Sequence, residues 1–163
     1  MSSAVDIDAL LAAPKALGGA PTWVRDDTSA VVRLAAPVAL SGVVGSLILH
    51  AHATLQTTPQ RGSCVLVYEG QVVQRLSILP DHAHFNPFNT STPTVLRGFI
   101  LPAGASRSYP WPLNRAWPRA TGDNVSVAEP LLVETVAEGL TIFLALCGIE
   151  GDLPPPPWEP RLL

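Results

Sequence analysis

The four histidines of this chain all lie in His-Ala-His units, first as His50 and His52 and again as His82 and His84. On a β-strand, residues i and i+2 project from the same face about 7 Å apart, so two imidazoles can bind one metal ion. With a third ligand and an open coordination position, Zn, Fe, Ni or Mn could then support hydrolysis or oxygen chemistry. We therefore consider the four histidines as a metal site, with exposed histidines on a polar sheet face as the alternative.

The second His-Ala-His unit opens the connection DHAHFNPFNTSTP. Its density of Asp, Asn and Pro is typical of a structured loop, because these residues form turns and bond their own backbone. In the functional interpretation, His82, His84 and Asn86 line a site as general acid or base or as ligand contacts.

A second candidate site is the segment RSYPWPLNRAWPRATGDN, which sets arginines and aromatic residues among prolines. Arginine binds phosphate or carboxylate through two hydrogen bonds and indole offers a stacking surface, a combination found at protein hot spots and single-stranded nucleic-acid sites. The residues concerned are Arg107, Tyr109, Trp111, Arg115, Trp117 and Arg119. In the alternative interpretation, the tryptophans cap the core and the arginines bond the acidic C-terminal helix.

The distribution of charge favours an anion as the partner of this segment. Residues 82–122 carry four arginines and no acidic residue, whereas residues 123–163 carry seven acidic residues and one arginine. This asymmetry predicts either an anion-binding middle segment or two complementary parts of one fold. The net charge of −3 and the single lysine argue against nucleic acid, so we expect a protein or a small anionic ligand.

Two stretches resemble the motifs of the cupin barrels. GSLILHAHATLQTTPQRG resembles the first motif, with these residues at its positions: Gly45, His50, His52, Gln56 (in place of glutamate) and Gly62. LPAGASRSYP resembles the second motif, with Pro102 and Gly104 present and Arg107 in place of the last ligand histidine. The resemblance implies a cupin-like barrel, and it implies a metal site only if His82 or His84 replaces a missing ligand.

Hydrophobic periodicity predicts the strands that position these residues. The expected strands cover residues 28–40, interrupted at Pro37, then 42–56, then 63–78 with a two-residue hairpin turn at Glu69-Gly70, and finally 94–102. The hairpin register pairs Tyr68 with Gln71, Val67 with Val72 and Leu66 with Val73. Within residues 42–56, alternation places His50 and His52 opposite the apolar side chains of Leu47, Leu49 and Leu55.

Helices are expected at both ends of the chain. A short N-terminal helix capped by Asp6 or Asp8 ends at Pro14, and an amphipathic helix begins near Pro130 and ends at Gly148. The proline-rich residues 151–163 are expected to form an extended tail anchored by Trp158. The predicted fold is mainly β within the α+β class: an antiparallel meander sheet or open barrel of about four to six strands, with the C-terminal helix on one face.

Length and composition predict a single domain over residues 1–163, since 47% hydrophobic and 14% charged residues are ordinary for a globular chain. The start of the chain lacks a signal-peptide pattern, which favours the cytoplasm and no membrane association. One lysine among ten basic residues, with abundant Ala and Pro, is typical of a GC-rich bacterial genome. We expect a binding or accessory protein without a cofactor, with a metal-dependent enzyme as the alternative.

Overall fold

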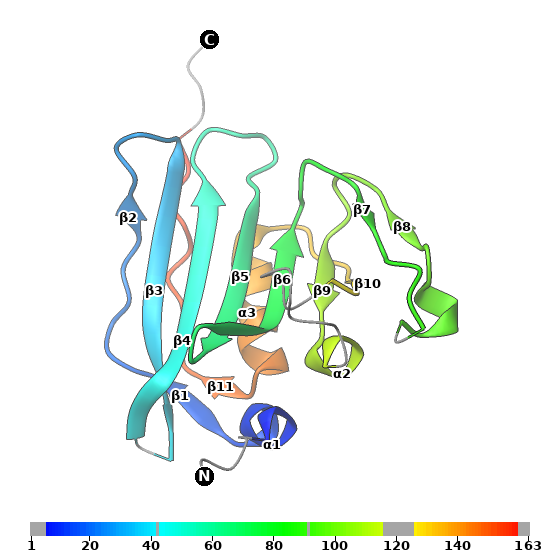
Figure 1. Ribbon diagram of the computed structural model, residues 1–163. Helices are drawn as coiled ribbons and strands as arrows, with labels where there is room; N and C mark the ends of the chain where they lie inside the picture. The colour runs from blue at the N-terminus through cyan, green and yellow to red at the C-terminus, as the bar shows by residue number, and fades with distance from the viewer. Residues whose placement is uncertain (1–5, 42, 91, 116–125, 160–163) are drawn as a thin grey trace.

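A mixed β-sheet of nine strands forms the centre of the fold (Figure 1). The computed structural model describes residues 6–41, 43–90, 92–115 and 126–159. The sheet strands are β1 (Lys15–Leu17), β2 (Val24–Arg25), β3 (Val31–Leu40), β4 (Val43–Thr54), β5 (Gly62–Tyr68), β6 (Gln71–Ile78), β9 (Arg107–Tyr109), β10 (Glu129–Pro130) and β11 (Ile149–Glu150). Their order is β10-β9-β6-β5-β4-β3-β1-β11, with β2 also pairing with β3.

The remaining elements lie around this sheet. They are α1 (Ile7–Ala12), α2 (Trp111–Asn114), α3 (Val136–Leu146), a 3-10 turn η1 (Thr94–Leu96) and the two-stranded sheet of β7 (His84–Phe85) and β8 (Ile100–Leu101). Figure 1 shows α3 behind β5 and β6, and among the described elements no helix lies in front of β3 to β6. The prediction of a mainly β fold with a C-terminal helix on one sheet face is confirmed.

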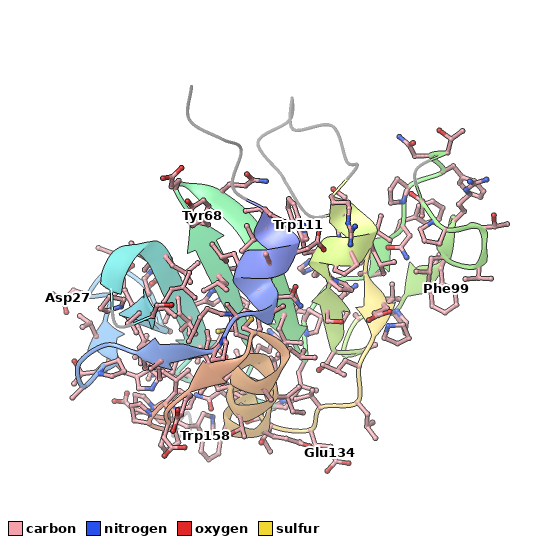
Figure 2. The ribbon with its side chains drawn as sticks, turned by 90° about the horizontal axis from the view of Figure 1, so that it is seen from below. Asp27, Tyr68, Phe99, Trp111, Glu134 and Trp158 are labelled. Atoms are coloured by element: carbon pink, nitrogen blue, oxygen red, sulfur yellow. The ribbon has the colours of Figure 1, made fainter. Side chains whose placement is uncertain are left out.

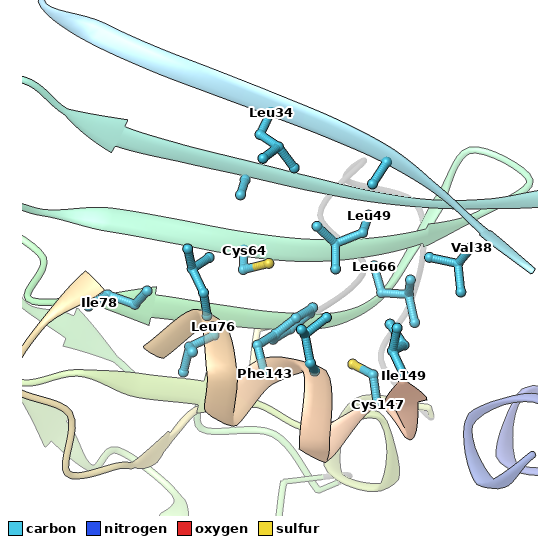
Figure 3. Close-up of a cluster of buried hydrophobic side chains, with 14 of the residues drawn as sticks. Leu34, Val38, Leu49, Cys64, Leu66, Leu76, Ile78, Phe143, Cys147 and Ile149 are labelled. Atoms are coloured by element: carbon cyan, nitrogen blue, oxygen red, sulfur yellow. The ribbon is translucent and has the colours of Figure 1, made fainter. Parts of the chain in front are cut away.

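Alternation on β3, on β5 and on the described side chains of β4 separates a core face from an outer face, and β6 joins it beyond a bulge. Leu34, Ala51, Cys64 and Leu76 are register neighbours across β3, β4, β5 and β6, and all four are buried. In Figure 3 the core-facing side chains of the sheet point toward Phe143 and Cys147 on the α3 side. Burial raises the pKa of the Cys147 thiol to about 12, so this thiol remains protonated and behaves as a small apolar group.

The C-terminal helix begins later than its apolar pattern suggests. Thr135 caps α3, because its hydroxyl accepts a hydrogen bond from the Glu138 N–H at 3.1 Å. Pro130 is part of β10, where it pairs with Arg107, so the predicted start near Pro130 is wrong. The end is as expected: Gly148 has φ +63° after the last turn, and the chain then enters β11 beside β1.

The predicted hairpin is present, but its register shifts after two pairs. Tyr68 pairs with Gln71 and Val67 with Val72, as predicted. The predicted pair of Leu66 with Val73 is wrong, because a β-bulge leaves Val73 without a partner on β5 and pairs Leu66 with Gln74. Every residue of β6 after the bulge therefore faces the side opposite to that predicted.

The sheet is larger than predicted and open. Five of its strands have only two or three residues, too few to show a period-2 pattern. The predicted strand at 94–102 is wrong except for Ile100–Leu101, and β9 occupies the position next to β6 instead. The two ends of the sheet, β10 and β11, do not pair, so the barrel implied by the cupin resemblance is not found.

Both ends of the described chain lie against the sheet domain. Asp6 caps α1, and the Lys15 ammonium donates hydrogen bonds to the carbonyls at its far end, those of Leu10, Leu11 and Ala13. Residues 152–159 of the proline-rich tail form neither helix nor strand, and the Trp158 indole donates to Thr57 O at 3.0 Å. The rest of the predicted tail, 160–163, lies outside the described residues. Figure 2 shows Trp158 on the α3 side of the molecule. In the part of the chain that the structure describes, no helix is long and apolar enough to cross a membrane.

Candidate functional site

The outer face of the sheet carries the first His-Ala-His unit. His52 lies between Arg33 on β3 and Ser63 on β5, and Ser63 in turn pairs with Ser77 on β6. In the adjacent row, one pleat away, the four register neighbours are Ala35, His50, Val65 and Arg75. These two rows gather two arginines, two histidines and two serines on one face, because alternate residues of each strand point the same way.

A shallow hollow of about 640 Å³ lies over these rows, and we call it the outer trough. Its lining residues are Val24, Arg33, Leu34, Ala35, His50, Ala51, His52, Ser63, Val65 and Arg75. No acidic side chain is among them. Asp26 lies outside the lining and approaches Arg33 Nε only to 4.0 Å, with both side chains accessible to water.

The surroundings of His52 favour the neutral form of its imidazole. Partial desolvation lowers the pKa of this imidazole, and the positive charges of Arg33 and Arg75 lower it further. The hydroxyl of Ser63 is 2.9 Å from His52 Nδ1, which fixes the orientation of the ring. His52 therefore has a neutral ring at pH 7, positioned between two cations.

Arg75 is held in place by an aromatic ring rather than by an acid. Its guanidinium carbon lies 5.2 Å from the centre of the Tyr109 ring, a cation–π contact between β6 and β9. Its Nε is buried without a hydrogen-bond partner among the described residues. Because Arg75 lines the outer trough, its guanidinium can donate hydrogen bonds to a ligand oxygen there.

The second His-Ala-His unit lies on the same side of the sheet, but its two rings differ in position. His82 is exposed, 3.1 Å from an Asp81 carboxylate oxygen, and it lines a smaller hollow together with His52. His84 contacts Tyr109 edge-on at 5.2 Å between ring centres, and its Nε2 lies 2.8 Å from Ser126 O. Over the described residues, no three His, Cys, Asp or Glu side chains are grouped as a metal ion would require.

Asn86 bonds the backbone of the segment that leads into β10. It is fully buried, its side-chain amide donates to Ala128 O at 2.8 Å, and its Oδ1 accepts from Ala128 N at 2.8 Å. Asn114 holds the neighbouring residue in the same manner, with bonds to both backbone groups of Val127. The two asparagines thus hold the chain just before β10 by replacing strand pairing.

The Arg/Trp segment, residues 107–124, does not form one exposed surface in its described part. Arg107 is fully buried and donates to the carbonyls of His82 at 2.7 Å and Leu101 at 3.3 Å. Tyr109 and Trp111 are also buried. Arg115 is exposed and pairs with Asp8 of α1 at 2.8 Å, while Trp117 and Arg119 lie outside the described residues.

No protein-family model, curated protein or solved structure matches the chain. Its function must therefore be inferred from the chemistry of its own surface.

Two features of this surface were not predicted from the sequence. Strand pairing brings Arg33 and Arg75 next to the histidines, and the sequence does not reveal this pairing. The sequence does indicate that Arg75 and Ser77 share one face of their strand, because they alternate with apolar Leu76 and Ile78. Exposed apolar side chains also gather around β7 and β8, and Figure 2 shows one of them, Phe99, on the opposite side of the view from Asp27. They are Phe85, Phe88, Val95, Phe99 and Ile100.

Proposed function

We propose that this protein binds a small organic anion in the outer trough. The observation that carries this proposal is the lining itself: Arg33, Arg75, His50 and His52 surround the hollow, and no acidic side chain lines it. His52 is neutral at pH 7, but Arg33 and Arg75 are charged, and no acidic side chain of the lining balances them. An anionic ligand would supply the opposite charge. Positive groups on fixed strands also need little reorganisation when the anion binds.

The floor of the trough favours an anion with an apolar body. Ala35 and Val65 lie on either side of His50, Val24 lies beside Arg33 at the edge of the trough, and all three offer aliphatic contact. A volume of about 640 Å³ falls in the range of small-molecule sites, roughly 300–1,000 Å³. Of the two partners expected from the sequence, a protein or a small anionic ligand, the geometry favours the small ligand.

The test is a calorimetric titration with two anionic probes, benzoate and phenyl phosphate, and with neutral benzyl alcohol as reference. Arg33→Ala and Arg75→Ala are each expected to weaken binding of the anions roughly tenfold, since charge-assisted hydrogen bonds contribute about 1.5–3 kcal/mol. Arg115→Ala is the matched control, because Arg115 is an exposed arginine paired with Asp8 away from the trough. The proposal fails if the anions bind no better than benzyl alcohol, or if Arg115→Ala weakens binding as much as the trough variants do.

A further inference from the structure

A second, smaller hollow adjoins the outer trough, and we call it the side pocket. It has a volume of about 160 Å³. The lining residues that bear on a ligand are His52, Arg61, Ser63, Arg75, Ser77 and Asp81. His52, Ser63 and Arg75 line both hollows, so one ligand can reach from one into the other.

The two hollows differ in chemistry. Aliphatic side chains such as Val65 make up part of the trough floor, whereas the side pocket has three hydroxyl groups, those of Thr54, Ser63 and Ser77. The side pocket also has two arginines: Arg61 lies just before β5, and Arg75 lies on the neighbouring strand β6. The Thr54 hydroxyl already bonds Thr57 and the backbone of Arg61, so the hydroxyls of Ser63 and Ser77 are the ones that can contact a ligand. Two hydroxyls with two guanidinium groups suit a head group with three acceptor oxygens better than a carboxylate with two.

Arg75 connects the two hollows. Its Nε is buried and has no hydrogen-bond partner among the described residues, and Tyr109 holds the guanidinium from the other side. Because Arg75 lines both hollows, its guanidinium can donate hydrogen bonds to a ligand oxygen in either of them.

Asp81 is the acidic residue that lines the side pocket. Its carboxylate is exposed, and it contacts Arg61 NH1 at 3.6 Å and His82 Nδ1 at 3.1 Å. In the free protein the Asp81 carboxylate therefore partly neutralises the positive charge of Arg61. A strongly charged head group competes for Arg61 better than a singly charged one, because its Coulomb attraction to the guanidinium is larger.

From these contacts we infer that the ligand is a phosphomonoester, with its phosphoryl group in the side pocket and its apolar body on the trough floor. This inference rests on the proposed function of the trough. The two arginines and the hydroxyls of Ser63 and Ser77 bind the phosphoryl oxygens, and Val24, Ala35 and Val65 contact the body. No bond is made or broken.

Three probes separate the parts of the inference: phenyl phosphate, benzoate and O-phosphoserine, each titrated by calorimetry into the full chain. Phenyl phosphate is expected to bind about tenfold more tightly than benzoate, which lacks the third oxygen, and more tightly than O-phosphoserine, which lacks the apolar body. Arg61→Gln is expected to abolish the advantage of phenyl phosphate over benzoate. Asp81→Asn is expected to increase that advantage, because it removes the competing carboxylate. Arg25→Gln is the matched control, since Arg25 pairs with Glu159 outside both hollows.

Each other outcome overturns a distinct statement. Equal affinities for phenyl phosphate and benzoate, unchanged by Arg61→Gln, would overturn the phosphoryl assignment while leaving an anion site in the trough. Equal affinities for phenyl phosphate and O-phosphoserine would overturn the role of the apolar floor. Absence of binding by all three probes would overturn the proposed function and this inference together.

Discussion

Arg33 on β3 lies directly opposite His52 on β4, and both side chains stand on the outer face of the sheet. In an antiparallel pair such neighbours interact strongly, since their Cβ atoms are only about 4.5–5.5 Å apart. Two potentially cationic residues in this position repel each other when both are charged. The repulsion is reduced if His52 stays neutral or if an anion lies between the two.

The pKa of His52 is the first prediction. Partial desolvation and the charges of Arg33 and Arg75 place it below the usual value of 6.5 for a histidine. An NMR titration of the ring protons should therefore give a value below 6.5 in the wild type and a higher value in Arg33→Ala and in Arg75→Ala. An unchanged pKa in both variants would show that the arginine charges do not reach the ring.

The pH dependence of stability follows from two histidines. The pKa values of His52 and His84 are both lowered in the folded state, mainly by desolvation, so the unfolded chain takes up these protons first as the pH falls. The free energy of unfolding should decrease from about pH 6.5 downward through the folded pKa values, and it should not change through these groups above pH 7. Urea unfolding at several pH values should show a smaller decrease in the His52→Gln/His84→Gln variant, and an identical decrease would refute the assignment.

Asn86→Ala should destabilise the fold without touching the trough. It removes both hydrogen bonds to Ala128 and leaves buried backbone groups unpaired, at a cost of about 2–4 kcal/mol in unfolding free energy. Val95→Ala is the control from the same region, because Val95 is 84% exposed and should change stability by less than about 0.5 kcal/mol. Similar small effects of both substitutions in chemical denaturation would mean that Asn86 does not hold the segment before β10.

Gly139→Ala tests the close approach of α3 to β6. Alanine favours a helix over glycine by about 1 kcal/mol. A Cβ at this position, however, would lie 2.5 Å from Ile78 Cδ1, and Ile78 is fully buried. We expect the collision to dominate, with a net loss of about 1–3 kcal/mol. Ile78→Val removes the colliding methyl group and should recover part of the loss in the double variant; a stabilising Gly139→Ala would contradict the tight packing.

The sequence predicts the face that each residue of a long strand occupies, and it fails where register depends on distant contacts. The alternation around His50 and His52 and the turn at Glu69-Gly70 are local patterns, and both are present in the fold. If the pairing continued from that turn without a bulge, Arg75 would pair with Cys64 and face the core. The bulge at Val73 turns Arg75 to the outer face, as the alternation of polar Arg75 and Ser77 with apolar Leu76 and Ile78 indicates.

In the Arg/Trp segment the sequence does not reveal that a charged side chain is buried. A charged residue such as Arg107 is expected at the surface, because burial of an unpaired charge is costly. Here the backbone carbonyls of His82 and Leu101 accept its hydrogen bonds. Those partners are brought to Arg107 by the connection that carries β7 and β8, and no periodicity in the sequence reveals their positions.

The most direct measurement is a map of backbone amide chemical-shift changes in ¹⁵N-labelled protein during titration with phenyl phosphate. Saturable shifts are predicted at Arg33, His50, His52, Ser63 and Arg75, which line the outer trough on four adjacent strands. Shifts that instead gather at Arg115 or around β7 and β8, or the absence of saturable shifts, would contradict the proposal that the outer trough binds an organic anion.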